Sequence, residues 1–420
     1  MKSHAAETQP PVDRRRFLEG TLAFAASAAL LKSSPGYAEE KAPEPKAEPK
    51  RKVKLGLVGC GGRGNWLLNL FKQHGGYECY AMADYFQEVA EASGKAYGVD
   101  KARCFGGLSG YKKLIESGVE AVAIIDVPYF YPEQARDAVA AGVNVYMAKP
   151  VAVDVPGTLM VGEAAKEATK KQRVFLVDYQ LPLEPACIEV ATRIRDGALG
   201  KLVHLASFGL AWQAWPDPAL TPNIESRLRG EIWLSDTNLS GDTIVSYDIH
   251  IIDGIMWVMG KRPVSACGMA RTCRPEPHGD RTDSATAVYE YDDGTIWTHV
   301  TQSLSNGFDI ALPTLSANFF GMTVTAHLQY GGKVYVRGGQ KHYAGTCGSI
   351  YDDGAKRNIA TFHTNITEGK FENASAQRAV DGHLAAILGR EAAARRKYLT
   401  MEELIKENKR LEVDLKGLKA

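Results

Sequence analysis

Two hydrophobic patterns divide the chain. Between about residues 53 and 178, short continuous apolar runs alternate with amphipathic segments, as in 119–125, 143–147 and 174–177. Strands that helices cover on both faces read as unbroken apolar runs. The pattern therefore predicts repeated β-α units and a parallel sheet, with helices at 87–97, 111–117, 133–141 and 156–169.

From residue 202 onward the apolar and polar positions alternate over longer stretches. Strands are expected at 202–210, 264–271, 284–291, 295–303, 322–327 and 333–337, with hairpin turns at 292–294 and 331–332. Helices are expected at 247–259 and 373–390. This predicts an open sheet with one face covered by helices. A broad free face usually pairs with a second subunit, so we expect a homo-oligomer, a dimer or tetramer.

The predicted fold class is α/β: an N-terminal Rossmann domain with a doubly wound parallel sheet, then a C-terminal α+β domain with a large, mostly antiparallel open sheet. The 420 residues are too many for one ordinary core. We divide them into a signal peptide (1–38), a disordered linker (39–52), an NAD-binding domain (53–178) and a substrate-binding and oligomerisation domain (179–420).

The first 38 residues resemble an export signal. Arg14, Arg15 and Arg16 precede Phe17 and Leu18 in a twin-arginine pattern, followed by the short apolar core 20–31 and small residues up to Ala38. The expected location is the periplasm, reached by the twin-arginine route. A basic N-terminal helix or an uncleaved anchor is the alternative.

Charge and cysteine content narrow the class further. The formal net charge is +1, and no long basic run follows the linker, so neither nucleic acid nor an anionic membrane is an expected partner. No apolar run after the signal is long enough to span a membrane, so none is expected to do so in the mature form. The seven cysteines form no CxxC pair; we expect one or two disulfides at most, and buried free thiols in preference.

A glycine-rich turn carries the strongest chemical signal. Residues 59–64, Gly-Cys-Gly-Gly-Arg-Gly, follow a short apolar strand, precede an amphipathic segment and fit G-x-G-x-x-G. Asp84 stands twenty residues later, where a carboxylate can accept bonds from ribose hydroxyls and would repel a 2′-phosphate. NAD is therefore favoured over NADP. The predicted cofactor-binding residues are Gly59, Gly61, Gly62, Arg63, Gly64, Asp84, Pro128, Lys149 and Gln180.

Two residues are candidates for proton transfer. Lys149 lies between a strand and Pro150, at the sheet edge where the nicotinamide half should lie, and acts at neutral pH only if its pKa falls. His250 can accept a hydroxyl proton, with Asp253 on a neighbouring helical face; Asp248 is expected to be exposed or to begin the helix. Possible substrate or catalytic residues are Tyr131, Asp248, Ser246, Trp212 and Trp233. No metal site is expected.

With these residues in view, the chain resembles the Gfo/Idh/MocA family of sugar and inositol oxidoreductases. The resemblance covers about residues 53–405 and rests on the glycine turn with Asp84, Ala140–Gly142, Lys149-Pro150, Ile194–Gly200, Gly241-Asp242 and His250 with Asp253. It implies that Lys149 and His250 are catalytic. Three positions depart from the family: Ala148 replaces a glutamate, Pro132 a histidine and Ser246 an aspartate. Losing carboxylates near Lys149 would make it easier to deprotonate.

The resemblance leaves three functions open. The first is an NAD-dependent oxidoreductase of a carbohydrate, whose tightly bound cofactor is loaded before export and regenerated within the cycle. The second is a redox-neutral NAD-dependent glycoside hydrolase or lyase that works through a transient keto-sugar, with Tyr131, Asp248 or His204 as an additional base. The third is a non-catalytic NAD-dependent sugar binder.

Overall fold

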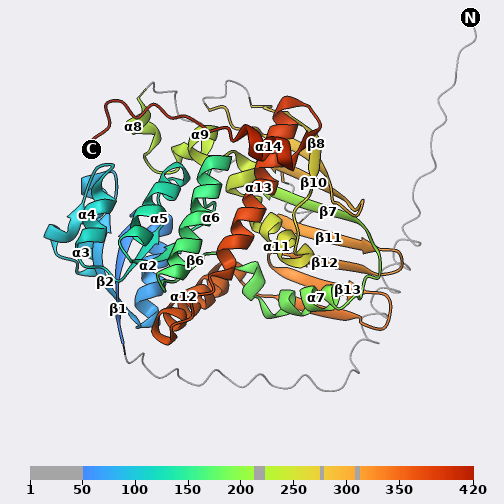
Figure 1. The fold of residues 1–420 in the computed structure, drawn as a ribbon, viewed down its shortest axis with the longest axis horizontal. Helices are drawn as coiled ribbons and strands as arrows, with labels where there is room; N and C mark the ends of the chain where they lie inside the picture. Colours follow the sequence, from blue (N-terminus) through green and yellow to red (C-terminus); the bar gives the residue numbers. More distant parts are fainter. Residues whose placement is uncertain (1–50, 212–222, 275–278, 308–312) are drawn as a thin grey trace, which may run out of the picture. The chain divides into compact units, whose positions relative to one another are not determined.

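A computed structural model describes residues 51–211, 223–274, 279–307 and 313–420. The predicted signal peptide and nearly all of the linker lie outside these residues. In the first half of the chain, apolar runs form strands and the amphipathic segments between them form helices (Figure 1). The strands are β1 (Val53–Val58), β2 (Tyr77–Ala83), β3 (Cys104–Phe105), β4 (Ala121–Ile124), β5 (Asn144–Met147) and β6 (Phe175–Val177). The helices are α2 (Gly62–His74), α3 (Gln87–Tyr97), α4 (Gly110–Glu116), α5 (Tyr131–Ala140) and α6 (Val155–Lys170).

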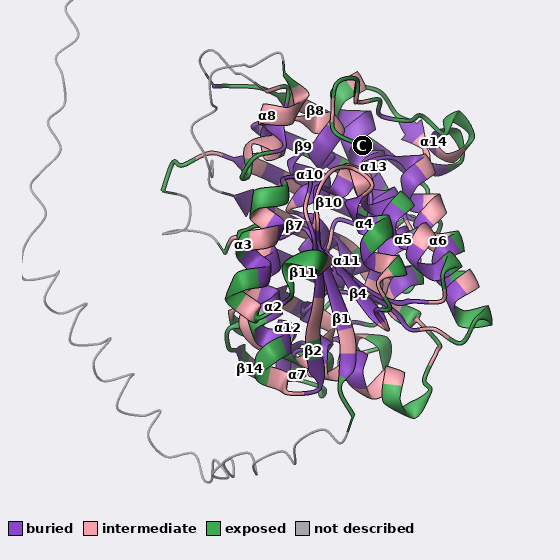
Figure 2. Cartoon of the chain, turned by 90° about the vertical axis from the view of Figure 1, so that its left-hand side faces the viewer, coloured by how far each residue is buried: buried purple, intermediate pink, exposed green. Residues whose placement is uncertain are grey.

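These strands form one parallel sheet in the order β3-β2-β1-β4-β5-β6. The order reverses between β1 and β4, which is the doubly wound arrangement that places a ligand at the carboxyl ends of the strands. Every residue of β4 and β5 is buried, as the continuous apolar runs predict. Figure 2 shows this contrast: the central strands are buried, and the outer surfaces of helices such as α3 are exposed.

The second half of the chain forms the predicted open sheet. Its strands are β7 (Leu202–Ala211), β8 (Ser265–Arg271), β9 (Ser284–Glu290), β10 (Ile296–Ser303), β11 (Leu315–Gly321), β12 (Thr325–Gln329), β13 (Gly332–Arg337), β14 (Tyr343–Cys347) and β15 (Leu399–Thr400). Their order is β14-β13-β12-β11-β7-β10-β9-β8-β15, and β7 with β10 is the parallel pair. The other described pairs are antiparallel.

The longer helices of this half are α7 (Pro185–Arg195), α11 (Ile249–Met259), α12 (Ile350–Glu368) and α13 (Ala374–Arg395); the shorter are α8 (Ile224–Arg227), α9 (Thr237–Ser240), α10 (Thr243–Ser246) and α14 (Met401–Glu407). The described ranges also contain the 3₁₀ turns η1 (Lys101–Arg103), η2 (Pro128–Phe130), η3 (Leu181–Leu183) and η4 (Ile232–Ser235). None of the helices in the described ranges has the length and apolarity needed to cross a bilayer.

Helix α13 joins the two sheets. It packs against α6 and β6 of the first half and against α11, β8 and β9 of the second. Strand β6 is an edge strand, and two side chains at the start of α13 satisfy its outward N–H groups: Asn373 Oδ1 accepts from Phe175 N at 2.7 Å, and Ser375 Oγ from Val177 N at 3.1 Å. The boundary near residue 178 stays a prediction, since the chain returns to the Rossmann half after the second sheet.

Each of the seven cysteines, all within the described part of the chain, is a free thiol in the structure. Cys187 in α7 and Cys347 at the end of β14 are both buried, with their sulfurs 3.4 Å apart.

Candidate active site

The glycine turn between β1 and α2 has the shape that an anionic diphosphate requires. Gly59 has φ +89°, and a Cβ there would lie 2.3 Å from the carbonyl oxygen of Ile125. A Cβ on Gly64 would lie 1.9 Å from the oxygen of Gly59, so only glycine lets helix and strand pack this closely. Gly61 and Gly62 face open space at the start of α2, where unpaired N–H groups favour an anion. The turn therefore fits a dinucleotide.

Asp84 follows β2 and braces the same turn. Its Oδ2 accepts from Cys60 N and its Oδ1 from Phe86 N, both at 2.9 Å. Burial raises the pKa of the Asp84 carboxyl, and the two N–H bonds oppose that rise. The side chain is half-buried and lines the cavity next to the glycines.

A cavity of about 930 Å³ opens over this edge of the sheet. That volume is within the range of small-molecule and cofactor sites. Its Rossmann wall contains Gly59, Gly61, Gly62, Arg63, Gly64, Asp84, Tyr85, Phe86, Leu108, Asp126, Val127 and Phe130. Its other wall contains Leu228, Gly230, Ile232, Trp233, Leu415 and Ala420. Trp233 therefore lines this cavity, whereas Pro128, buried at the start of η2, is not among its lining residues.

Lys149 lies in the turn after β5. Its Nζ donates to the carbonyl oxygen of Ser246 at 2.8 Å, so the Ser246 backbone contacts the lysine. Burial and the nearby positive charge of Arg63 lower the pKa of Lys149 to about 7, against the opposing effect of Asp178 and Asp248. A lysine with this pKa can both donate and accept a proton near neutral pH, which is the condition that the sequence analysis set for a catalytic role of Lys149.

Helix α13 holds the Lys149 turn in place. His383 Nε2 accepts from Val151 N at 2.9 Å, and its Nδ1 lies 2.7 Å from the carbonyl oxygen of Ala379. Burial lowers the pKa of His383 to about 4, so the ring is neutral, with its proton on Nδ1. His383 is buried and holds the turn in position through its bond to Val151 N.

His250 lies in α11, close to the side chains of three tyrosines. Its Nδ1 is 3.1 Å from the Tyr330 hydroxyl, and its ring centre is 5.0 Å from that of Tyr330, 5.2 Å from Tyr351 and 6.4 Å from Tyr247. Burial, then the charges of Lys149 and Arg63, hold the pKa of His250 well below its usual value. The imidazole is therefore neutral at neutral pH and can accept a proton.

Two acids of α11 have partners other than His250. Asp253 pairs with Arg378 of α13 at 2.7 Å, and burial raises the pKa of Asp253 to about 6. Of the two placements expected for Asp248, the one at the helix start is correct, because Asp248 is the N-cap residue of α11. The exposed placement is wrong: Asp248 is fully buried, and its Oδ2 lies 3.0 Å from His299 Nε2. The reason is long-range packing, because β7 passes Asp248 at Gly209, where a Cβ would lie 2.0 Å from the carboxylate.

The other sequence candidates are placed as follows. Tyr131 begins α5, is buried, and is near enough to Asp126 and Arg63 to feel their charges. Gln180 is buried and donates to the Asp178 backbone at 3.1 Å, while Asp178 pairs with Arg63 at 3.2 Å. Trp212 lies outside the described residues. Among the described residues, no group of three or more His, Cys, Asp or Glu side chains could hold a metal ion.

Sequence reasoning missed the residues that reach the site from afar. Tyr330, Tyr351 and His383 come from three separate segments of the second half, and nothing in their local sequence marks them. The site combines two features. One is a Rossmann sheet with an anion-binding turn, and the other is a second sheet domain that supplies a histidine near a lysine whose pKa is lowered. Together they define the class of two-domain dinucleotide-dependent oxidoreductases.

The chain belongs to the Gfo/Idh/MocA family. The model described as "Oxidoreductase family, NAD-binding Rossmann fold" matches residues 53–179, and the "GFO/IDH/MocA C-terminal domain" matches residues 188–321. Together these matches cover most of both sheets.

Individual relatives are distant. Inositol 2-dehydrogenase of Burkholderia ambifaria is 24% identical over 217 residues, which are 51% of this chain and 56% of that protein. The chain spans about half the length of the curated relatives it matches. Levoglucosan dehydrogenase, solved with NADH and levoglucosan, is similar with a TM-score of 0.68 at 17% identity, over 84% of this chain and 100% of that one. Aldose-aldose oxidoreductase from Caulobacter crescentus, solved with glycerol, gives 0.67 at 16%, over 83% and 100%. These structures share the fold.

Proposed function

We propose that this protein is an NAD-dependent oxidoreductase that acts on a hydroxyl group of a sugar or sugar derivative. The observation that carries the proposal is the pairing of Lys149, with a pKa of about 7, with a neutral His250 whose own pKa responds to the lysine charge. Related proteins of the same family include inositol and levoglucosan dehydrogenases, which supports a polyhydroxylated substrate.

In this proposal, different residues of the chain accept the proton, position the lysine and bind the substrate. Oxidation of a hydroxyl releases a proton, and neutral Lys149 and neutral His250 are the two bases available to take it. Arg63 keeps the lysine amine from holding its own proton too tightly, and the Ser246 carbonyl and His383 fix its position. The tyrosines around His250 offer hydroxyls and ring faces to a sugar. Bound NAD would supply the hydride acceptor. NAD is preferred to NADP because Asp84 lines the cavity where a 2′-phosphate would be repelled.

We further propose that residues 1–38 direct the folded protein to the periplasm, with the cofactor loaded beforehand and regenerated within the cycle. The twin-arginine pattern at Arg14 to Arg16 supports this step. The redox-neutral glycosidase ranks second, because the relatives named above are dehydrogenases and an oxidoreductase. A sugar binder ranks third, because a lysine with a neutral pKa is characteristic of acid–base chemistry.

One set of assays separates the three. Protein purified without added nucleotide is analysed by mass spectrometry for copurified NAD, then mixed with a panel of free sugars while NADH absorbance is followed. We expect bound NAD and NADH formation with at least one sugar. Phenol release from aryl glycosides without net NADH would instead establish the glycosidase.

The matched variants are Lys149→Ala and Lys166→Ala; Lys166 is a surface lysine of α6. Lys149→Ala should abolish turnover while NAD stays bound, and Lys166→Ala should behave as wild type. If Lys149→Ala leaves every detected activity unchanged, the lysine is not catalytic and the binder is favoured.

A further inference from the structure

Two segments from the second half of the chain cover one end of the cavity, the end where Asp84 lies. They are residues 223–240 and residues 411–420, which we call the clasp. Leu228, Trp233 and Leu415 of the clasp line the cavity opposite Asp84 and Phe86. In Figure 1 the red tail runs from α14 past α9 and α8 and ends beside α4 of the Rossmann half.

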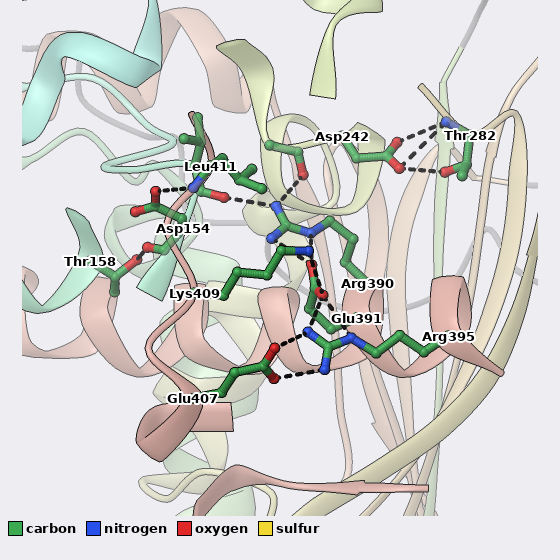
Figure 3. Close-up of polar contacts among 12 residues, drawn as sticks. Asp154, Thr158, Asp242, Thr282, Arg390, Glu391, Arg395, Glu407, Lys409 and Leu411 are labelled. Carbon is green, nitrogen blue, oxygen red and sulfur yellow. Dashed lines mark hydrogen bonds and ion pairs between the residues drawn. The ribbon is translucent and has the colours of Figure 1, made fainter. Parts of the chain in front are cut away.

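The tail is anchored where it leaves α14. Arg395 of α13 pairs with Glu407 and Glu391, both at 2.6 Å, and Leu411 N donates to Asp154 Oδ2 at 2.9 Å (Figure 3). Asp154 also caps α6, so the start of the tail is tied to both halves of the molecule. One residue later, Asn238 donates to the Glu412 carbonyl at 2.8 Å and joins the two clasp segments.

The outer end of the clasp is bound to loops of the Rossmann half. The Tyr85 hydroxyl donates to Glu225 Oε1 at 2.9 Å and accepts from Lys419 N at 3.1 Å. Leu108 N donates to the Lys419 carbonyl at 3.0 Å. Tyr85 therefore links both clasp segments through one hydroxyl, directly after Asp84.

An apolar cluster separate from the main core lies under these bonds. Tyr85, Phe86 and Val127 of the Rossmann half are buried together with Leu228 and Leu239 of the clasp, and Val413 and Leu418 pack against them. Arg229 lies over the Phe86 ring at 3.9 Å and pairs with Glu88 at 2.9 Å. The contact is thus apolar inside and polar at its rim, as in a binding interface.

We propose that the clasp completes the adenosine-binding half of the dinucleotide site and keeps the cofactor from leaving. This rests on the proposed function, since it assumes that the cavity binds NAD. The ribose next to Asp84 fixes the adenosine at this end, where Leu228, Trp233 and Leu415 cover it. Release then requires the tail to detach from Tyr85 and Leu108, so the clasp slows dissociation and retains a cofactor that cannot be replaced outside the cytoplasm.

The test measures how fast NAD leaves the holoprotein. Full-length mature protein is loaded with isotope-labelled NAD, chased with unlabelled NAD, and sampled over time. Leu415→Asp and Leu418→Asp should each release the label at least ten times faster than wild type, because a charge in the cavity lining or against the apolar cluster favours the open tail. Lys416→Ser is the matched control, since Lys416 is an exposed neighbour in the same tail, and should release label at the wild-type rate.

A milder variant guards against misfolding. Tyr85→Phe keeps the buried ring and removes the hydroxyl that bonds Glu225 and Lys419, and should speed release severalfold with an unchanged melting temperature. Wild-type release rates in all three test variants would overturn the clasp while leaving NAD binding intact. A wild-type protein that binds no NAD would overturn the proposed function as well.

Discussion

The proposed chemistry depends on one half-buried amine, that of Lys149. Lys149 donates to the Ser246 carbonyl, while burial, followed by the positive charge of Arg63, lowers its pKa and weakens its hold on a proton. Since the two carboxylates that oppose the effect are already paired, Asp178 with Arg63 and Asp248 with His299, neither fully restores the charge of the lysine.

This predicts a specific pH profile. Because the pKa of Lys149 is about 7 and oxidation needs its neutral form, kcat/KM for sugar oxidation should rise through pH 7 and level off above it. The pKa of His250 is well below its usual value, so the titration of His250 should cause no further change in kcat/KM above pH 7. Lys149→Arg should lower kcat by about 100-fold or more. Lys166→Arg serves as control, and a flat wild-type profile would contradict the assignment.

At this scale, sequence reasoning identifies as candidates the residues that their neighbours along the chain mark. The glycine turn, Asp84, Lys149 and His250 each stand in a recognisable local pattern. Tyr330, Tyr351, His383 and the tail residues at 411–420 have no such pattern, because their roles arise only when distant segments pack together. The burial of Asp248 was missed for the same reason, although its place at the start of α11 was among the expectations.

Close contacts between elements restrict several positions to glycine. Strand β7 crosses the start of α11 at Gly209, whose Cβ would lie 2.0 Å from the Asp248 carboxylate. That carboxylate is held by His299, which also lies 2.8 Å from Ser207 Oγ. The buried network therefore has no room to shift.

We predict that Gly209→Ala lowers the free energy of unfolding by about 2–4 kcal/mol, because overpacking against a buried, hydrogen-bonded carboxylate is costly. Gly382→Ala in α13 is the control: its Cβ would meet its nearest atom at 3.5 Å, and alanine favours helix by about 1 kcal/mol. Chemical denaturation followed by circular dichroism measures both. Equal stability of the two variants would show that β7 can move.

The pattern of elements was largely predictable, and its errors have physical causes. The parallel sheet and its helices follow from continuous apolar runs. The expected strand at 322–327 is wrong in position, because Met322 is an exposed residue of the turn between β11 and β12. Strands β11 and β14 were missed, since apolar and polar residues alternate weakly in their sequences. Helix α12 was missed as well. The β7–β10 parallel pairing depends on contacts that no local pattern encodes.

The outer face of the second sheet carries exposed apolar side chains. Met269, Val288, Ile296 and Phe320 come from four strands, point to the same side and are 36–69% exposed. An apolar surface that spans four strands is typical of a subunit interface.

We predict that the protein is a homo-oligomer through this face. Light scattering should give more than one chain mass for wild type, and Val288→Lys with Ile296→Lys should reduce it toward one, since buried unpaired charges oppose association. Ile188→Lys is the control, because Ile188 is 40% exposed on helix α7 and does not belong to these strands. A monomeric wild type would refute the prediction.

The side chains that cover the edge of β6 are added late in the synthesis of the protein. Phe175 and Val177 are synthesised long before Asn373 and Ser375, whose side chains satisfy their N–H groups. While translation proceeds, that edge is open to pairing with other chains, which is a known route to aggregation. A nascent chain of this protein therefore needs protection until residue 375 has emerged, and fragments that stop earlier should be insoluble when expressed alone.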